Sequence, residues 1–164
     1  MEKTKLDIIS DKELETYLVK KAYKFTDEEI SSGQFIFWLV YYMEKRLTGM
    51  LKNTLKVFVQ CSDDSVKKII DIVFEESYLS AKITVLEKSL SDPLKMESPE
   101  TKGLCGYYRE INNIRNSLFH NKEIKDIKYK GKSILDRKTK ELMIRDLFAK
   151  LIAFHKVVKE ANKD

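Results

Sequence analysis

The sequence predicts an all-α fold, an up-and-down bundle of about six helices with a small β-hairpin near residues 125–135. Apolar side chains recur at steps of three and four along most of the chain, which places them on one side of a helix. There are only 5 glycines and 2 prolines against 35% charged residues, so long uninterrupted segments are expected. The 164 residues, 43% of them hydrophobic, are enough to form a single domain over 1–164.

The amino-terminal part is expected to hold two helices. The first runs from a cap at Ser10 or Asp11 to about residue 24, and the second, the longest, covers 33–60 after a polar connection. Residues 35–43 are apolar on every side, so they need cover as core, as part of a subunit interface, or as both. The residues expected to face inward are Leu14, Tyr17, Leu18 and Ala22, then Ile36, Val40, Met43, Leu47, Met50 and Leu51.

Two more helices are expected before the only clear linker. A turn at 62–65 precedes a helix over 66–74, and another helix covers 77–90. Residues 91–99 contain Pro93 and Pro99 and join helices within one bundle. The side chains expected inward are Val66, Ile69, Ile70, Val73 and Phe74, then Leu79, Ile83, Leu86 and Leu90.

The fifth helix, from about residue 100 to a cap at Asn121, carries two patterns at once. A core stripe is formed by Leu104, Tyr107, Ile111, Ile114 and Leu118. One neighbouring side presents, in order of rotation about the axis, Arg115, Tyr108, Phe119, Asn112, Asn116 and His120. Those side chains include groups that can hold and cleave a phosphodiester.

The last segments are a hairpin and a helix. Apolar residues alternate before and after Lys130, Gly131 and Lys132, which predicts a β-hairpin with these three at its turn. The final helix covers 136–161, and its inward residues are Leu147, Phe148, Leu151, Phe154, Val157 and Val158.

Three cations in the first turn of that helix, Arg137, Lys138 and Lys140, oppose the helix dipole. An exposed end tolerates them at a cost of a few tenths of a kcal/mol, on the order of the weaker dipole effects. Alternatively, they form an anion site with the helix N–H groups. The sequence leaves both interpretations open.

Charge is distributed unevenly along the chain. Residues 1–100 carry 15 basic and 18 acidic side chains, net −3, whereas 101–164 carry 16 and 8, net +8. A basic face beside the fifth helix would attract a polyanion such as nucleic acid, although lysine-rich surfaces also serve solubility alone. The distant Cys61 and Cys105 match no ligand spacing and are expected to be reduced and packed, so no metal or cofactor is expected.

The amino terminus lacks the pattern of a signal peptide, and no apolar run reaches the length of a membrane span. These features predict a cytoplasmic protein without a membrane partner.

The two histidines have different surroundings. His155 lies near the apolar stripe of the last helix, where a structural role is expected. His120 follows Asn116 by four residues, so these two are neighbours on the helix surface, and Arg115 is adjacent to Asn116. His120 and Asn121 can also simply close the helix.

The segment Arg115-Asn116-Ser117-Leu118-Phe119-His120 resembles the signature of HEPN-domain ribonucleases: an Arg, a polar residue, and a His after four to six intervening residues. The resemblance extends to a helical bundle with the motif late in the chain and another long helix after it. In a related group of toxins, a Tyr two residues after the His is modified by a partner; here that position is Lys122, which departs from the pattern.

The resemblance implies a metal-independent endoribonuclease that cleaves single-stranded RNA. In this chemistry the RNA 2′-hydroxyl attacks the adjacent phosphorus while His120 moves protons, since imidazole titrates near neutral pH. Arg115 would grip the phosphate, and Asn116 would position His120 or the phosphate. The expected RNA-binding residues are Tyr108, Asn112, Phe119, Lys130, Lys132 and Arg137, with Tyr108 or Phe119 stacking on a base.

The mechanism needs a base and an acid, so a homodimer that brings two copies of the motif into one cleft is expected, as in HEPN enzymes. Phe119 and residues 35–43 are candidate interface residues, although they could equally be core in a monomer. The resemblance also implies a toxin or phage-defence role with an antitoxin or partner protein. The chief rival is a non-catalytic HEPN-like module that binds a nucleotide, RNA or a protein; a third is a structural dimerisation module.

Overall fold

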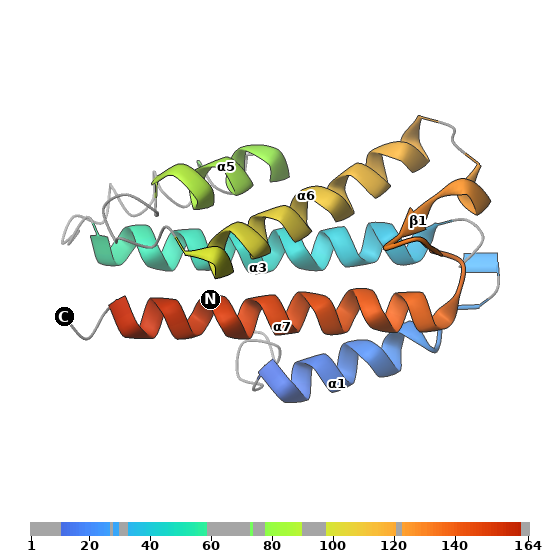
Figure 1. Cartoon of the computed structure of the whole chain (residues 1–164), viewed down its shortest axis with the longest axis horizontal. Helices are drawn as coiled ribbons and strands as arrows, with labels where there is room; N and C mark the ends of the chain where they lie inside the picture. Colours follow the sequence, from blue (N-terminus) through green and yellow to red (C-terminus); the bar gives the residue numbers. More distant parts are fainter. Residues whose placement is uncertain are drawn as a thin grey trace.

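The computed structural model describes residues 11–26, 28–29, 33–58, 73, 78–89, 98–120 and 123–161. These residues form a helical bundle with a small antiparallel hairpin, as the sequence predicts (Figure 1). Nearly all of the expected helix over 66–74 and of the 91–99 linker lies outside them, as does Cys61. Val73, the one described residue of that expected helix, is 51% exposed, so the prediction that it faces inward is wrong. In chain order the elements are α1 (Asp11–Ala22), α3 (Gln34–Phe58), α5 (Leu79–Ser89), α6 (Pro99–Phe119), η2 (Ile124–Asp126), β1 (Lys128–Tyr129), β2 (Lys132–Ser133) and α7 (Arg137–Ala161).

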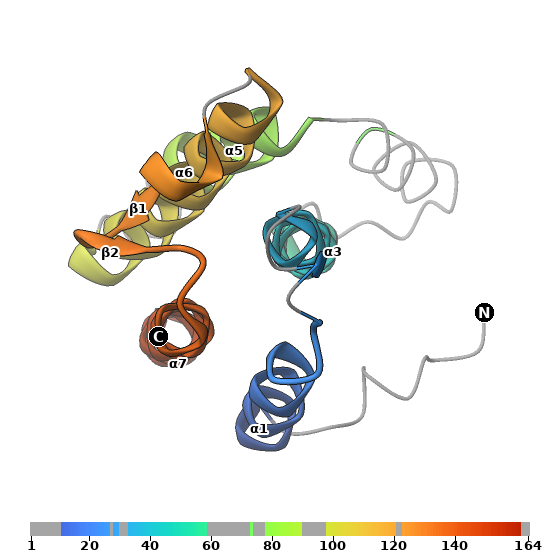
Figure 2. The same cartoon turned by 90° about the vertical axis from the view of Figure 1, so that its right-hand side faces the viewer.

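Helix α6 packs against α3, α5 and α7, and α1 packs against α7 (Figure 2). The core stripe predicted on α6 is confirmed, because four of its five residues are buried and Leu118 is half-buried. On α3, five of the six predicted inward residues are buried and Met50 is half-buried. Tyr17 of α1 is a wrong prediction: it is 49% exposed, whereas the adjacent Leu18 is buried.

Residues 35–43 of α3 are mostly core. Phe35, Leu39 and Met43 are almost completely buried, while Phe37 and Tyr41 remain exposed. Phe25, in the segment expected to be a polar connection, packs its ring against Phe35 at 5.8 Å between centroids. Packing within a single chain therefore largely explains why residues 35–43 are apolar on every side of the helix.

Helix α6 begins and ends at identifiable contacts. Ser98 caps its first turn, with Oγ accepting a hydrogen bond from the backbone N–H of Thr101 at 3.2 Å, and Pro99 occupies the first helical position. At the other end, Leu118 lies against Gly33, whose φ is +76°. A Cβ at Gly33 would lie 3.0 Å from the Leu118 side chain, so glycine lets the end of α6 approach the start of α3 closely.

The hairpin pairs Lys128 with Ser133 and Tyr129 with Lys132. Its turn consists of Lys130 and Gly131, both with positive φ (48° and 78°), as in a type I′ turn. Lys132, expected at the turn, instead begins β2. Tyr129 is buried and its hydroxyl donates to Asp146 Oδ2 at 2.6 Å, which attaches the hairpin to α7.

Candidate functional site

The predicted motif lies at the carboxyl end of α6. The helix ends at Phe119, and His120 is its C-cap, with the backbone N–H donating to the carbonyl of Asn116 at 3.0 Å. The side chains of Leu118 and Phe119 contact Gly33 and Phe37, so the motif lies beside the start of α3. Asn121, the predicted cap, lies outside the described residues.

Arg115 and Asn116 contact each other directly. Nε and Nη2 of Arg115 both donate to Oδ1 of Asn116, at 3.3 and 3.1 Å, and both residues are half-buried. Asn116 lies between Arg115 and His120 in rotation about the helix axis. Its amide therefore holds the guanidinium on the side of the helix that faces toward His120.

His120 is exposed, and in the described part of the chain its imidazole forms no hydrogen bond. It follows Arg115 by five positions, which corresponds to roughly 140° around a helix axis. One copy of the motif thus presents the cation and the imidazole on adjoining sides of α6.

Tyr108 does not belong to the surface that could contact RNA, contrary to the prediction. Its side chain is completely buried, and burial raises the pKa of its hydroxyl well above the usual value, with Tyr42 and Arg46 of α3 nearby. The reason is its position on α6: it lies closer to the core stripe than Asn116 does, and α3 covers it. Asn112, one turn further along, is half-buried, and its Oδ1 accepts no hydrogen bond from the part of the chain that the structure describes.

Phe119 is 63% exposed and packs against Phe37 of α3, with ring centroids 5.1 Å apart and planes at 80°. Tyr41, one turn after Phe37, is also 63% exposed. Sequence reasoning identified Phe119 but could not pair it with Phe37, which is remote in the chain. We call Phe37, Tyr41 and Phe119 the aromatic strip.

Of the two interpretations of the first turn of α7, its contacts favour the one without an anion site. Asp136 occupies the helix terminus, with Oδ1 accepting from the backbone N–H of Lys138 at 3.0 Å. Lys140 is buried and its Nζ donates to the carbonyl of Leu135 at 2.8 Å. Arg137 donates to the carbonyl of Tyr23 at 3.1 Å. A carboxylate therefore occupies the helix terminus, and two of the three cations, Arg137 and Lys140, are held by backbone carbonyls of the chain.

The remaining predicted RNA-binding lysines lie on the hairpin. Nζ of Lys130 contacts Oδ2 of Asp146 at 2.6 Å, whereas Lys132 is exposed. A surface ion pair of this kind contributes on the order of 0–1 kcal/mol, so it leaves Lys130 able to exchange partners. No contact joins either lysine to the motif among the described residues.

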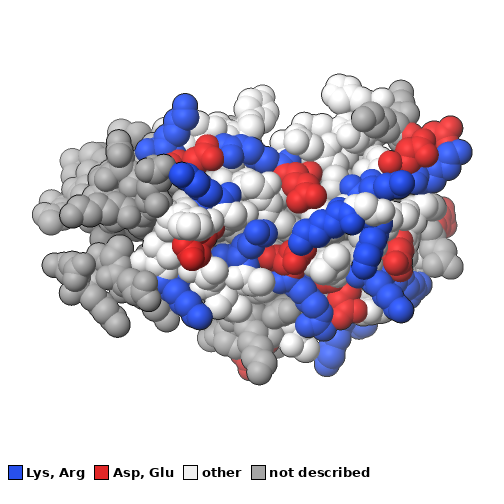
Figure 3. All heavy atoms as spheres, in the orientation of Figure 1, with Lys and Arg blue, Asp and Glu red and all other residues white. Residues whose placement is uncertain are grey.

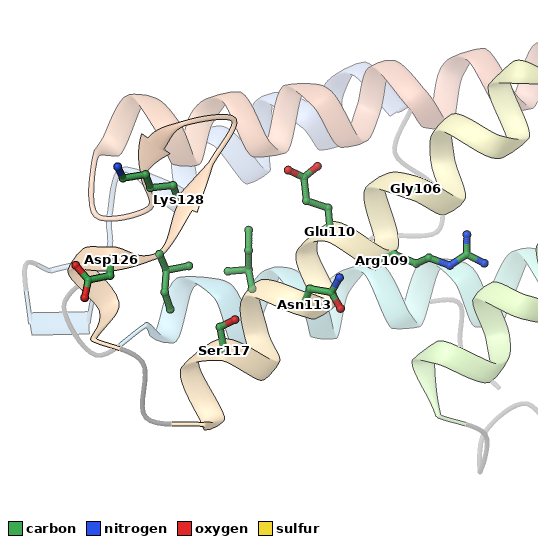
Figure 4. A pocket seen from close by; sticks show the side chains of 9 residues that line it. Gly106, Arg109, Glu110, Asn113, Ser117, Asp126 and Lys128 are labelled. Carbon is green, nitrogen blue, oxygen red and sulfur yellow. The ribbon is translucent and has the colours of Figure 1, made fainter.

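A groove of about 510 Å³ follows another side of α6, where η2 and β1 approach it (Figure 4). Arg109 at one end pairs with Glu87 of α5, with Nη1 and Oε1 2.8 Å apart. Sequence reasoning did not identify this groove. The available signal was the spacing of Asn113 and Ser117, two polar residues four positions apart that share one side of the helix before His120. Its lining residues are Gly106, Arg109, Glu110, Asn113, Ile114, Ser117, Asp126, Ile127 and Lys128.

Charge on the face drawn in Figure 3 is mixed, with basic and acidic side chains interleaved. Several basic residues are paired with carboxylates, among them Lys82 with Glu44 and Arg109 with Glu87. On this face the charges therefore do not form the basic surface that would attract a polyanion.

Within the described ranges, no group of three or more metal-ligating side chains occurs, and no helix is long and apolar enough to cross a membrane. Comparison of the chain with models of protein families, with curated proteins and with solved structures gives no match. Interpretation of the site therefore depends on the side chains at the end of α6 and on their contacts.

Proposed function

We propose that this protein is a metal-independent endoribonuclease of the HEPN type that cleaves single-stranded RNA. The observation that supports it is the contact of Arg115 with Asn116 one turn before the exposed His120. A guanidinium for a phosphate, an amide that orients it and an imidazole for proton transfer are the groups that this reaction needs.

In the proposed reaction, His120 takes the proton from the 2′-hydroxyl, and the 2′-oxygen attacks the adjacent phosphorus. The bond from phosphorus to the 5′-oxygen breaks, and that oxygen receives a proton from a second imidazole. The products are a 2′,3′-cyclic phosphate and a 5′-hydroxyl. Arg115 stabilises the charge that builds on the phosphate oxygens.

The second imidazole is proposed to come from another copy of the chain. In the described part of the chain His120 is the one exposed histidine, because His155 is half-buried beside Phe154. A two-fold axis near the end of α6 would place His120 of each copy close to Arg115 of the other.

The test is cleavage of single-stranded RNA in the presence of EDTA. His120→Ala and Arg115→Ala are each expected to lower the rate by about 100-fold or more. Matched controls are His155→Gln and Arg145→Ala, the latter an exposed arginine of α7 paired with Glu141. Both controls should retain the wild-type rate. Undiminished cleavage by His120→Ala and Arg115→Ala would reject the assigned site.

The position of His120 favours the rival function, a non-catalytic module that binds a nucleotide, RNA or a protein. His120 is the C-cap of α6, and its backbone N–H donates to the carbonyl of Asn116, so in the rival His120 closes the helix while Arg115 grips a phosphate. RNA binding that depends on Arg115, without any cleavage, would support the module.

A toxin or phage-defence role, with an antitoxin or other partner protein, follows from the family resemblance alone. It predicts that expression of the wild-type chain in bacterial cells arrests growth. Expression of His120→Ala to the same level should not arrest growth, and equal arrest by both would contradict a role based on cleavage.

A further inference from the structure

The aromatic strip joins two parts of the chain that are far apart in sequence. Phe37 and Tyr41 are four residues apart on α3, so they lie one turn apart on the same side of that helix. The Phe37 ring meets Phe119 of α6 nearly edge to face, and Tyr41 and Phe119 are each 63% exposed. Large rings that remain this exposed on adjoining elements form a surface for a flat apolar ligand.

Positive charge borders the strip on both helices. Nζ of Lys45 lies 5.6 Å from the centroid of the Tyr41 ring. Arg115 precedes Phe119 by four residues and is therefore its neighbour on α6. The carboxylate nearest in sequence on α3, Glu44, is paired with Nζ of Lys82 at 2.9 Å.

We propose that the aromatic strip is the platform on which unpaired bases of the RNA stack, while the backbone passes Arg115 and Lys45. Exposed rings bordered by cations match a polymer of flat bases joined by phosphates. Bases within a duplex already stack on one another, so the platform selects single-stranded RNA. This inference rests on the proposed function and assigns substrate binding to α3, outside the motif.

The test measures binding of a fluorescently labelled single-stranded RNA by anisotropy, in a His120→Ala background that prevents cleavage. Adding Tyr41→Ala is expected to weaken binding by about 5- to 150-fold, the usual range for loss of one stacked base. Tyr41→Phe should restore binding, because it retains the ring. The matched control is Tyr78→Ala, which removes an 83% exposed ring just before α5 and should leave binding unchanged.

Lys45→Gln supplies a second measurement. It should weaken binding and reduce the slope of log affinity against log salt by about 1. Circular dichroism melts of all variants should agree with that of the parent, since both substituted α3 side chains are exposed.

Three results would overturn the inference. They are binding of RNA by Tyr41→Ala as tight as by the parent, competition by an equal mass of duplex as strong as by single strands, and conversion of a dimer to a monomer by Tyr41→Ala. The last result would make the strip an interface between copies. If RNA cleavage depends on His120 while Tyr41→Ala binds normally, the proposed function stands and the platform fails; a parent that binds no RNA rejects both.

Discussion

Tyr107 and Tyr108 are adjacent in sequence and both buried, but their hydroxyl groups differ in hydrogen bonding. The Tyr107 hydroxyl donates to the carbonyl of Met143 at 2.7 Å, whereas the Tyr108 hydroxyl has no hydrogen-bond partner among the described residues. Tyr107→Phe should therefore lower the free energy of unfolding by about 1 kcal/mol, while Tyr108→Phe should leave it unchanged or raise it. Urea unfolding of both variants checks this. A larger loss in Tyr108→Phe than in Tyr107→Phe would show that the Tyr108 hydroxyl is satisfied.

Asn116 is expected to act through Arg115. Asn116→Ala removes the acceptor of two guanidinium hydrogen bonds, so Arg115 loses its fixed orientation. We expect kcat for RNA cleavage to fall by about 10-fold or more, with a smaller change in KM. The melting temperature should change little, because the pair is only half-buried. Loss of stability with unchanged kcat would assign Asn116 a structural role instead.

At the scale of single residues, the sequence predicted the core stripe of α6 well, because helical spacing determines which side chains share a side. It could not predict which neighbouring residues are covered. Tyr108 and Phe119 occupy similar angular positions, yet one is buried and the other exposed, because Tyr108 lies in the middle of α6 near Tyr42 and Arg46 of α3, whereas Phe119 is the last residue of the helix. Contacts such as that of Phe37 with Phe119 depend on how the two helices pack in the folded chain.

At the scale of elements, the hairpin turn gives a sharp test. Gly131 has φ +78°, so Gly131→Ala should lower the free energy of unfolding by about 1 kcal/mol. Gly49 lies within α3, and a Cβ added there meets nothing within 4 Å. Gly49→Ala should therefore raise the free energy of unfolding by about 0.5–1 kcal/mol. The free energy of unfolding is measured with urea. A rise in Gly131→Ala as well as in Gly49→Ala would contradict the assigned turn.

The existence and bounds of the described helices were predictable to within a few residues, since caps and apolar spacing are local. The first turn of α7 was less predictable. Charge alone left an anion site open there, but Asp136 caps the helix and Lys140 is buried with its Nζ on the Leu135 carbonyl. The direction in which a long lysine extends depends on the tertiary contacts around it.

For the whole molecule, buried ionisable groups predict sensitivity to alkali. Burial raises the pKa of Cys105 to about 11 and the pKa values of Tyr107 and Tyr129 above their usual range. The unfolded chain ionises these groups at lower pH and so loses protons first. Their contribution to stability is complete below about pH 9 and declines above it.

Urea midpoints measured from pH 7 to pH 11 check this prediction. They should fall above about pH 9, and Cys105→Ala should make the decline between pH 9 and pH 11 shallower than in the wild type. A midpoint that stays constant to pH 11, or an unchanged decline in Cys105→Ala, would contradict burial of the thiol.

The proposed composite site also makes a prediction about assembly. If both imidazoles of a dimer are required, His120→Ala chains that exchange into wild-type dimers inactivate them. With wild type at about one quarter of the chains, activity should fall to about one sixteenth of that of the pure wild type at equal total protein. Activity that stays at about one quarter, after exchange has been verified, would indicate that each chain acts alone.

The central claim is that His120 and Arg115 promote attack by a 2′-hydroxyl. The most direct measurement uses a DNA strand that contains a single ribonucleotide, incubated with the protein in EDTA, with the ends of the fragments determined by mass spectrometry. The account predicts one cut, after the ribonucleotide, with a 2′,3′-cyclic phosphate and a 5′-hydroxyl, and no cut by His120→Ala. Cleavage of the all-DNA strand, or the same fragments from His120→Ala, would contradict it.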